Sequence, residues 1–216
     1  MRTTAEGAPG REPRVTKRRA ETRQRLLEAA LAVFAEEGFG RSTVEQVCSR
    51  AGYTRGAFYS NFSTLDELFL AMWEQRSADQ LARMREAFEA SEQAAVHDVS
   101  GVATHLLRAV PVDEEWYRVS AEFTAHALRN PDLRQVIVDR EKAIAASSMP
   151  FLLAALARIG RTVPEPDALA QALVAVHDGT ALQCLSEPDN PAVWQRRTDL
   201  FTRVVTAYSN ESREKS

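Results

Sequence analysis

Cysteine and long apolar runs are both scarce in this chain of 216 residues. Its two cysteines, Cys48 and Cys184, do not make the disulfide framework on which small secreted domains depend. No apolar run has the length of a membrane span, and no signal peptide begins the sequence. We therefore predict a cytoplasmic protein that makes no membrane contact.

The sequence also lacks the short motifs of common enzyme classes. It has no glycine-rich phosphate loop, no HExxH and no GxSxG. Its four histidines lie without the spacing of metal ligands: His97, His105, His126 and His177. His177 precedes Asp178, but neighbours on a helix point in different directions and do not form a metal site together. We expect no catalytic residue, no metal and no cofactor.

No strong excess of one charge is present, because the net charge is −3 and the pI about 5.9. The distribution is uneven, however. Residues 1–62 carry 11 Lys and Arg against 7 Asp and Glu, whereas residues 63–216 carry 16 against 23. A basic first part and an acidic remainder suggest DNA contact at one end and another task at the other. Chance solvation of helix faces explains the asymmetry about equally well.

What the chain does contain is helical periodicity along most of its length, and no stretch alternates like a strand for long enough to matter. The predicted class is all-α. The predicted helices run from after Arg19 to about Glu37, then over 42–51, 54–62, 64–88, 100–110, 114–130, 131–160 with an interruption near Pro150, 167–185 and 191–208.

The segment 42–62 has the pattern of two short helices joined by a tight turn. Ser42 with Glu45 fits a capping box, and Gly52 supplies the residue that tolerates positive φ where the first helix ends. On the second helix Phe58 and Phe62 point one way. Facing the other way are Arg55, Gly56, Tyr59 and Ser60. A helix-turn-helix presents its second helix to the DNA major groove in this manner.

A basic cluster precedes this segment at Lys17, Arg18 and Arg19. The cluster is either a DNA phosphate or minor-groove contact, as in other N-terminal arms, or the solvated start of a helix. Cations at a helix start oppose the helix dipole, and this favours the DNA contact.

Two apolar stripes mark the last two predicted helices, and they comprise Leu169, Leu173 and Val176 on one, and Trp194, Phe201, Val204, Val205 and Tyr208 on the other. Periodicity alone favours a plain core. Helix-turn-helix proteins usually bind two half-sites as symmetric dimers, and this shifts our expectation to a homodimer interface.

From Lys17 to Glu74 the sequence resembles the TetR family of transcriptional regulators. The resemblance rests on TRQRLLEAALAVFAEEGF (22–39), STVEQVCSRAGYTRGAFYSNF (42–62) and TLDEL (64–68), and segments 122–134 and 177–183 look similar to the C-terminal halves of some members. It implies an N-terminal three-helix DNA-binding domain and a larger helical domain that binds a small molecule and dimerises. We accordingly expect a tail over 1–16, a DNA-binding domain over 17–78, an effector-binding and dimerisation domain over 79–210 and a second tail over 211–216.

The resemblance also implies roles for individual residues. Thr43, with Ser42 beside it, resembles a phosphate contact at the start of the second helix. The remaining candidates are Arg55, Gly56 and Ala57 near the bases, Tyr59 on a phosphate, and Ser60 and Asn61 in the groove. Many members have a Lys just inside the fourth helix, whereas this chain has Leu65.

These expectations combine into a repressor that binds a palindromic double-stranded DNA operator as a homodimer and is released by a small-molecule effector. Bundles place ligand sites between helices, and the candidate wall residues are Trp73, Trp116, Tyr117, Glu122, Phe123, His126, Met149 and Phe151. Glu122 would favour a cationic or hydroxylated ligand. The alternative is a helical enzyme or adaptor whose helix-turn-helix has lost DNA binding, although no acidic residue lies among Arg55–Asn61.

Overall fold

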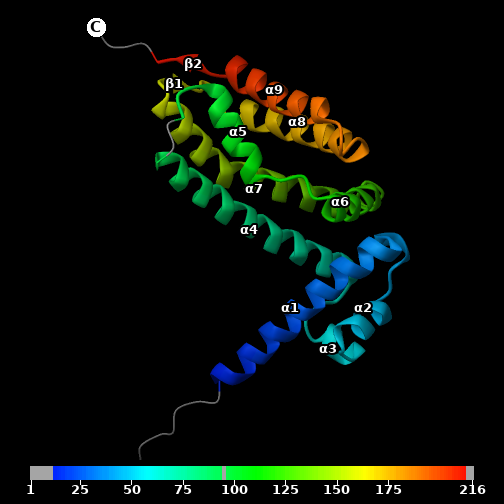
Figure 1. The fold of residues 1–216 in the computed structure, drawn as a ribbon. Coiled ribbons are helices and arrows are strands. Elements are labelled where there is room, and N and C mark those ends of the chain that lie inside the picture. Colours follow the sequence, from blue (N-terminus) through cyan, green and yellow to red (C-terminus); the bar gives the residue numbers. More distant parts are fainter. Residues whose placement is uncertain (1–11, 94–95, 213–216) are drawn as a thin grey trace, which may run out of the picture. The chain divides into compact units, whose positions relative to one another are not determined.

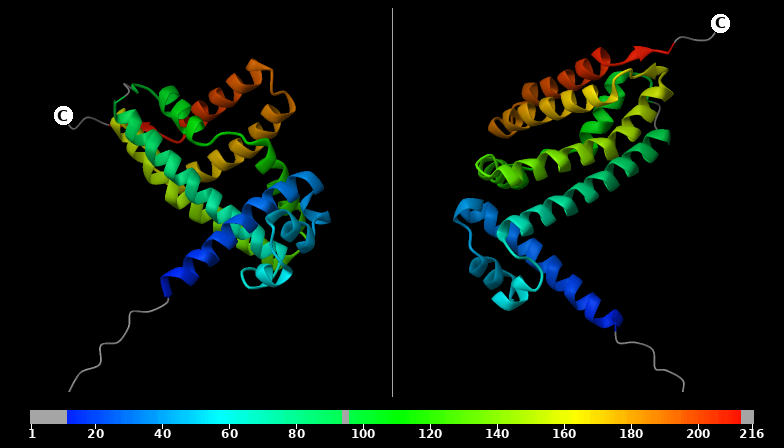
Figure 2. Two further views of the ribbon diagram at one scale, coloured as in Figure 1. Left: turned by 60° about the horizontal axis from the view of Figure 1, so that its bottom comes forward. Right: turned by 180° about the vertical axis from the view of Figure 1, so that it is seen from behind.

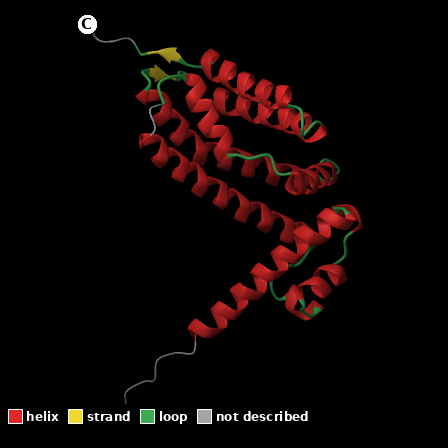
Figure 3. Cartoon of the chain, in the orientation of Figure 1, coloured by secondary structure: helices red, strands yellow, loops and turns green. Residues whose placement is uncertain are grey.

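The computed structural model describes residues 12–93 and 96–212, and their side chains over 17–86 and 96–212. The described chain is almost entirely helical, which confirms the predicted all-α class (Figures 1 and 3). It divides into two compact units, Met1–Glu74 and Gln75–Ser216. We call these the head and the body.

The head contains α1 (Glu12–Glu37), the 3-10 turn η1 (Phe39–Arg41), α2 (Val44–Ala51), α3 (Arg55–Tyr59) and the first residues of α4 (Leu65–Gln93). Aromatic side chains from α1, η1, α3, the loop after α3 and α4 pack in its core. Phe39 packs edge-on against Phe34 and Phe69, with ring centroids 5.0 and 5.8 Å apart. Phe58 packs on Phe62 at 5.9 Å. Edge-to-face rings of this kind add to the burial energy, so short helices can be held firmly.

Two predicted helix starts in the head are corrected. Helix α1 begins at Glu12, so Lys17–Arg19 lie inside a helix and not at its start, and the dipole argument does not apply to them. Helix α2 is capped by Thr43 and Gln46, not by Ser42 and Glu45. The Thr43 hydroxyl accepts from the Gln46 amide, and the Gln46 side chain accepts from the Thr43 amide. Gln serves in a capping box as Glu does, so the observed capping box lies one residue later than the predicted one.

The body contains α5 (Val99–Ala109), α6 (Glu114–Ala127), α7 (Pro131–Arg158), α8 (Pro166–Ser186) and α9 (Pro191–Ala207), with the rest of α4. Figure 2 shows α8 and α9 side by side in both views. The predicted interruption at Pro150 is absent, because α7 continues through it. Met149, Leu152 and Leu156 are all buried on either side of the proline, and this burial holds the helix across the missing N–H.

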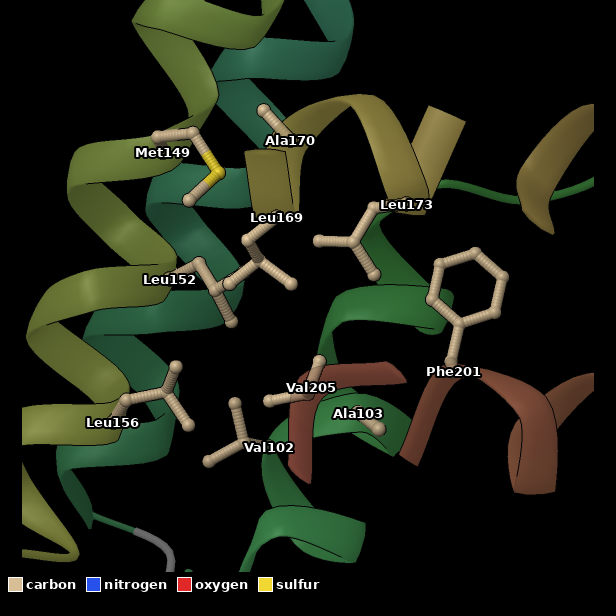
Figure 4. Close-up of a cluster of buried hydrophobic side chains, with 10 residues drawn as sticks. All are labelled: Val102, Ala103, Met149, Leu152, Leu156, Leu169, Ala170, Leu173, Phe201 and Val205. Carbon is tan, nitrogen blue, oxygen red and sulfur yellow. The ribbon is translucent and has the colours of Figure 1, made fainter. Parts of the chain in front are cut away.

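One apolar cluster forms the centre of the body, and side chains from four helices point toward one another in it (Figure 4). Its members are Val102 and Ala103 of α5, Met149, Leu152 and Leu156 of α7, Leu169, Ala170 and Leu173 of α8, and Phe201 and Val205 of α9. None of the helices in the described part of the chain is long and apolar enough to cross a membrane.

Two short strands that the sequence did not reveal pair beyond α7 and α9. β1 (Arg161–Thr162) runs antiparallel to β2 (Asn210–Glu211). The Arg161 side chain donates from Nε to Ser209 Oγ at 2.8 Å and from Nη2 to the Ser209 carbonyl at 2.6 Å. Glu211 therefore belongs to the body, and residues 213–216 of the predicted tail lie outside the described residues.

Candidate nucleic-acid interface and effector cavity

Helix α3 has one buried and one exposed face, as its sequence predicts. Phe58 and Phe62 are 0% and 1% exposed, whereas Tyr59 is 52% exposed. Thr54 caps the helix by accepting from the Ala57 amide at 3.3 Å. A five-residue helix has little stability of its own, so the two phenylalanines anchor it and leave the opposite face to solvent.

Gly56 is on the exposed face, and the described part of the chain leaves room for a side chain there. A Cβ added at Gly56 would meet Thr54 Oγ1 at 3.7 Å, which is an ordinary contact. Its backbone is not in the left-handed region that favours glycine either. Glycine weakens a helix, so an alanine would suit the helix better at this position.

The end of α3 is tied down by several hydrogen bonds. Arg19 of α1 donates from Nη2 to the Ser60 carbonyl at 3.0 Å. The Asn61 side chain donates to the Ala57 carbonyl at 2.8 Å, and the Ser60 hydroxyl donates to the same carbonyl at 2.9 Å. Arg19, Ser60 and Asn61, which we expected to contact DNA, thus hold the end of α3 in place within the chain. Lys17 and Arg18 are exposed.

The residues before α2 also have partners within the chain. The half-buried Ser42 donates its hydroxyl to the Gly38 carbonyl at 2.8 Å and lies outside the helix. Thr43 is exposed, and its hydroxyl caps α2. Ala57 is half-buried beside the exposed Arg55 and Gly56.

Arg55 is paired with Glu45, an acid for which the sequence predicts only a capping role. Its Nη1 lies 2.8 Å from Glu45 Oε1, and its guanidinium carbon lies 5.9 Å from the centre of the Tyr59 ring. Hydrogen bonding to Tyr59 and then the charge of Glu45 raise the pKa of Arg55. The sequence shows opposite charges near the starts of α2 and α3, but it does not show that the turn between the helices brings them together.

A cavity opens in the body between α4, α5 and α7. Its free volume is about 70 Å³, and it is partly open to solvent. Its described wall consists of Met84, Val96, Val102, His105, Leu106, Ala109, Phe151, Leu152, Ala155 and Arg158. The wall is therefore mainly apolar with two nitrogen-bearing side chains, which suits a small organic molecule.

Phe151 is the one residue among our eight ligand candidates that lines this cavity. Met149 and Phe123 are buried, Glu122 is exposed, and Trp73 belongs to the head, where its ring packs on Phe69. The other candidates, Trp116, Tyr117 and His126, lie on α6. Arg76 of α4 contacts the Trp116 ring and forms an ion pair with Asp113. Tyr117 is half-buried, and His126 lies beside Phe123.

Comparison with known proteins decides the family. Residues 95–207, more than half of the chain, match the family described as BetI-type transcriptional repressor, C-terminal. Residues 26–72 match the bacterial regulatory proteins of the tetR family.

The chain belongs to the TetR family. Members are transcriptional regulators, so it is a DNA-binding regulator and not an enzyme. The nicotine-responsive repressor HdnoR of Paenarthrobacter nicotinovorans is 29% identical over 87% of this chain and 94% of its own length. The repressor AcnR of Corynebacterium diphtheriae is 29% identical over 85% and 90%. The multidrug binding protein EbrR, solved with imidazole, is 29% identical and covers 84% of this chain and 93% of its own at a TM-score of 0.58.

The expected dimer residues of this TetR-family chain need correction. Leu169, Leu173, Phe201 and Val205 face the core of the body and are covered within one chain. Val176 and Val204 are half-buried against the same core. Trp194 and Tyr208 are exposed, at 38% and 37%. The sequence stripes therefore marked mainly the inner faces of α8 and α9, because both helices are apolar on more than one side.

A buried polar group joins α8 to α9. Arg197 is 3% exposed and donates to Thr180 Oγ1 at 2.6 Å and to the His177 carbonyl at 3.3 Å. Its Nη2 lies 3.0 Å from His177 Nδ1, and since the guanidinium only donates, the imidazole accepts. Burial and then the Arg197 charge lower the pKa of His177 from 6.5 to about 4, so this histidine is neutral at pH 7.

Proposed function

We propose that this TetR-family regulator is a repressor that binds a near-palindromic operator as a homodimer and is released when a small molecule enters the body cavity. The observation that carries the proposal is the exposed face of α3. It presents Arg55, Gly56 and Tyr59 to solvent, with two buried phenylalanines behind them. HdnoR and AcnR, similar along most of the chain, are both named repressors, which supports the same direction of control.

In this proposal Arg55 reads base edges, and Tyr59 with Thr43 positions the head on phosphates. Gly56 and Ala57 allow close approach to the bases. Lys17 and Arg18, exposed in the first half of α1, add phosphate contacts. Arg19, Ser42, Ser60 and Asn61 act by holding the elements that make contact.

The proposed dimer uses the outward faces of α8 and α9. Large apolar side chains remain exposed there, namely Val174, Leu182, Trp194, Leu200 and Tyr208, each between 36% and 52% exposed. Exposed apolar groups on adjacent helices favour association with a second copy. One reading helix per chain then places two half-sites about one helical turn, or somewhat more, apart.

The proposed effector site is the cavity between α4, α5 and α7. None of its described wall residues is acidic, and the wall includes His105 and Arg158. His105 Nδ1 lies 2.9 Å from the Gly101 carbonyl, so the nitrogen that remains can bond a ligand. We therefore favour a largely apolar ligand that is uncharged or anionic, in place of the cationic ligand that Glu122 suggested.

The experiment is selection of bound duplexes from a random-sequence DNA library by the full chain, with sedimentation analysis of the resulting complex. We expect enrichment of a near-palindrome bound by two chains. Failure to enrich any sequence would overturn the proposal and favour a protein whose helix-turn-helix no longer binds DNA. Binding of the selected site by one chain would overturn the dimer alone.

A further inference from the structure

The pair between Glu45 and Arg55 lies where the head would meet DNA. It joins the first turn of α2 to the first residue of α3, with a distance of 2.8 Å between Arg55 Nη1 and Glu45 Oε1. Both side chains are more than half exposed. An exposed pair of this kind contributes little to folding, so its position suggests another role.

The pair fixes the direction of the guanidinium. Glu45 occupies Nη1, and the Tyr59 ring lies beside the guanidinium carbon. An arginine has five N–H donors, so enough remain free for a bidentate bond to the O6 and N7 acceptors of guanine. Because a guanine edge is uncharged, it can be bound while the carboxylate stays in place.

A phosphate makes a different demand on the same arginine. A phosphate that approaches Arg55 brings a negative charge toward the Glu45 carboxylate, and the like charges repel. Binding in the wrong register relies on phosphates, whereas binding in the right register also uses base edges. The carboxylate should therefore penalise random DNA more than the selected site.

We propose that Glu45 is a positioning residue that sets sequence specificity by reserving Arg55 for base edges. This inference rests on the proposed reading role of Arg55. It concerns an acidic residue that carries no direct DNA contact in the proposed function.

The test compares Glu45→Gln with wild type on two duplexes of equal length, the site selected by the wild-type chain and a scrambled version of it. We expect the variant to bind the scrambled duplex three- to tenfold more tightly and the selected site nearly as before. The ratio of the two dissociation constants should fall by the same three- to tenfold.

Glu36→Gln is the matched control. Glu36 pairs with Arg50 at 2.7 Å and so links α1 to α2. Its replacement by Gln removes the same charge from the head without affecting α3. Its effect on the ratio should be absent. In an Arg55→Ala background Glu45→Gln should no longer change the ratio, because Glu45 acts through Arg55.

An unchanged ratio in Glu45→Gln, an equal fall in Glu36→Gln, or a fall that persists without Arg55 would each overturn the inference. Failure of the wild-type chain to select any site would instead overturn the proposed function, so the two failures are distinguishable.

Discussion

The head and the body differ in how clearly their sequences distinguish inside from outside. In α3 the buried face carries Phe58, with Phe62 just beyond the helix, and the exposed face carries Arg55 and Tyr59, so the two faces have different chemistry. In α8 the buried Leu169 and Leu173 are matched by the exposed Val174 and Leu182. An apolar side chain on both faces fits a core and an interface equally well. The lesson is that a stripe locates a helix face, while chemical contrast between faces tells which one is covered.

The largest expected effect on stability comes from a charge placed on the buried side of the body rather than on its exposed side. Phe201→Glu places a carboxylate in the central cluster and should lower the free energy of unfolding by about 3–5 kcal/mol. Leu182→Glu should leave that stability within about 0.5 kcal/mol and yield monomers. Chemical denaturation and sedimentation measure the two quantities. A stable monomeric Phe201→Glu variant would return this residue to the interface.

A buried histidine makes the stability of the body depend on pH. The folded-state pKa of His177 is about 4, below its ordinary 6.5, so the unfolded chain binds a proton more readily. Its stabilising contribution is present above pH 6.5 and is lost as the pH falls toward 4, by about 3 kcal/mol in total.

Denaturation of wild type and of His177→Gln at pH 7 and pH 4.5 tests this linkage. The wild type should lose more stability between these values than the variant does. His97→Gln, which alters an exposed histidine, should behave as wild type. Equal losses in all three proteins would show that His177 does not determine the response.

Within the head, Arg55 and Tyr59 should differ in kind. Arg55→Ala should cost on the order of 1–3 kcal/mol of discrimination between the selected and a scrambled duplex. Tyr59→Ala should weaken both duplexes alike, because a phosphate contact carries no sequence information. Titrations of both duplexes at one salt concentration measure the difference. If Arg55→Ala weakened both equally, Arg55 would be a positioning contact as well.

The smallest expected effect on folding is at Gly56. Gly56→Ala has room for its methyl group and should leave the stability unchanged or raise it by up to about 1 kcal/mol. DNA binding should weaken, since the methyl group keeps the backbone away from its partner. A variant that binds DNA as the wild type does would show that no close approach occurs at this position.

Much of the head could be predicted from sequence, and less of the body. Phe58, Phe62 and the Gly52 cap were predictable because local spacing determines them. The shift of the capping box to Thr43 was not, because Ser-x-x-Glu and Thr-x-x-Gln both fit the same stretch. The pairing of Glu45 with Arg55 and the position of the cavity depend on packing between elements, which spacing along one helix does not contain.

We propose above all that the body cavity and the head of this TetR-family chain are energetically coupled. Helix α4 is continuous from Leu65 in the head to Gln93 in the body, which gives the coupling a covalent route. The direct measurement is the affinity of the strongest hit from a thermal-shift screen of neutral and anionic apolar compounds, with and without the selected duplex.

The hit must lose binding in Ala155→Phe, which fills the cavity. Coupling is reciprocal, so DNA should weaken ligand binding by the same factor by which the ligand weakens DNA binding, about 5- to 150-fold. Identical ligand affinity with and without DNA would contradict the account and leave a regulator whose DNA binding does not respond to the cavity.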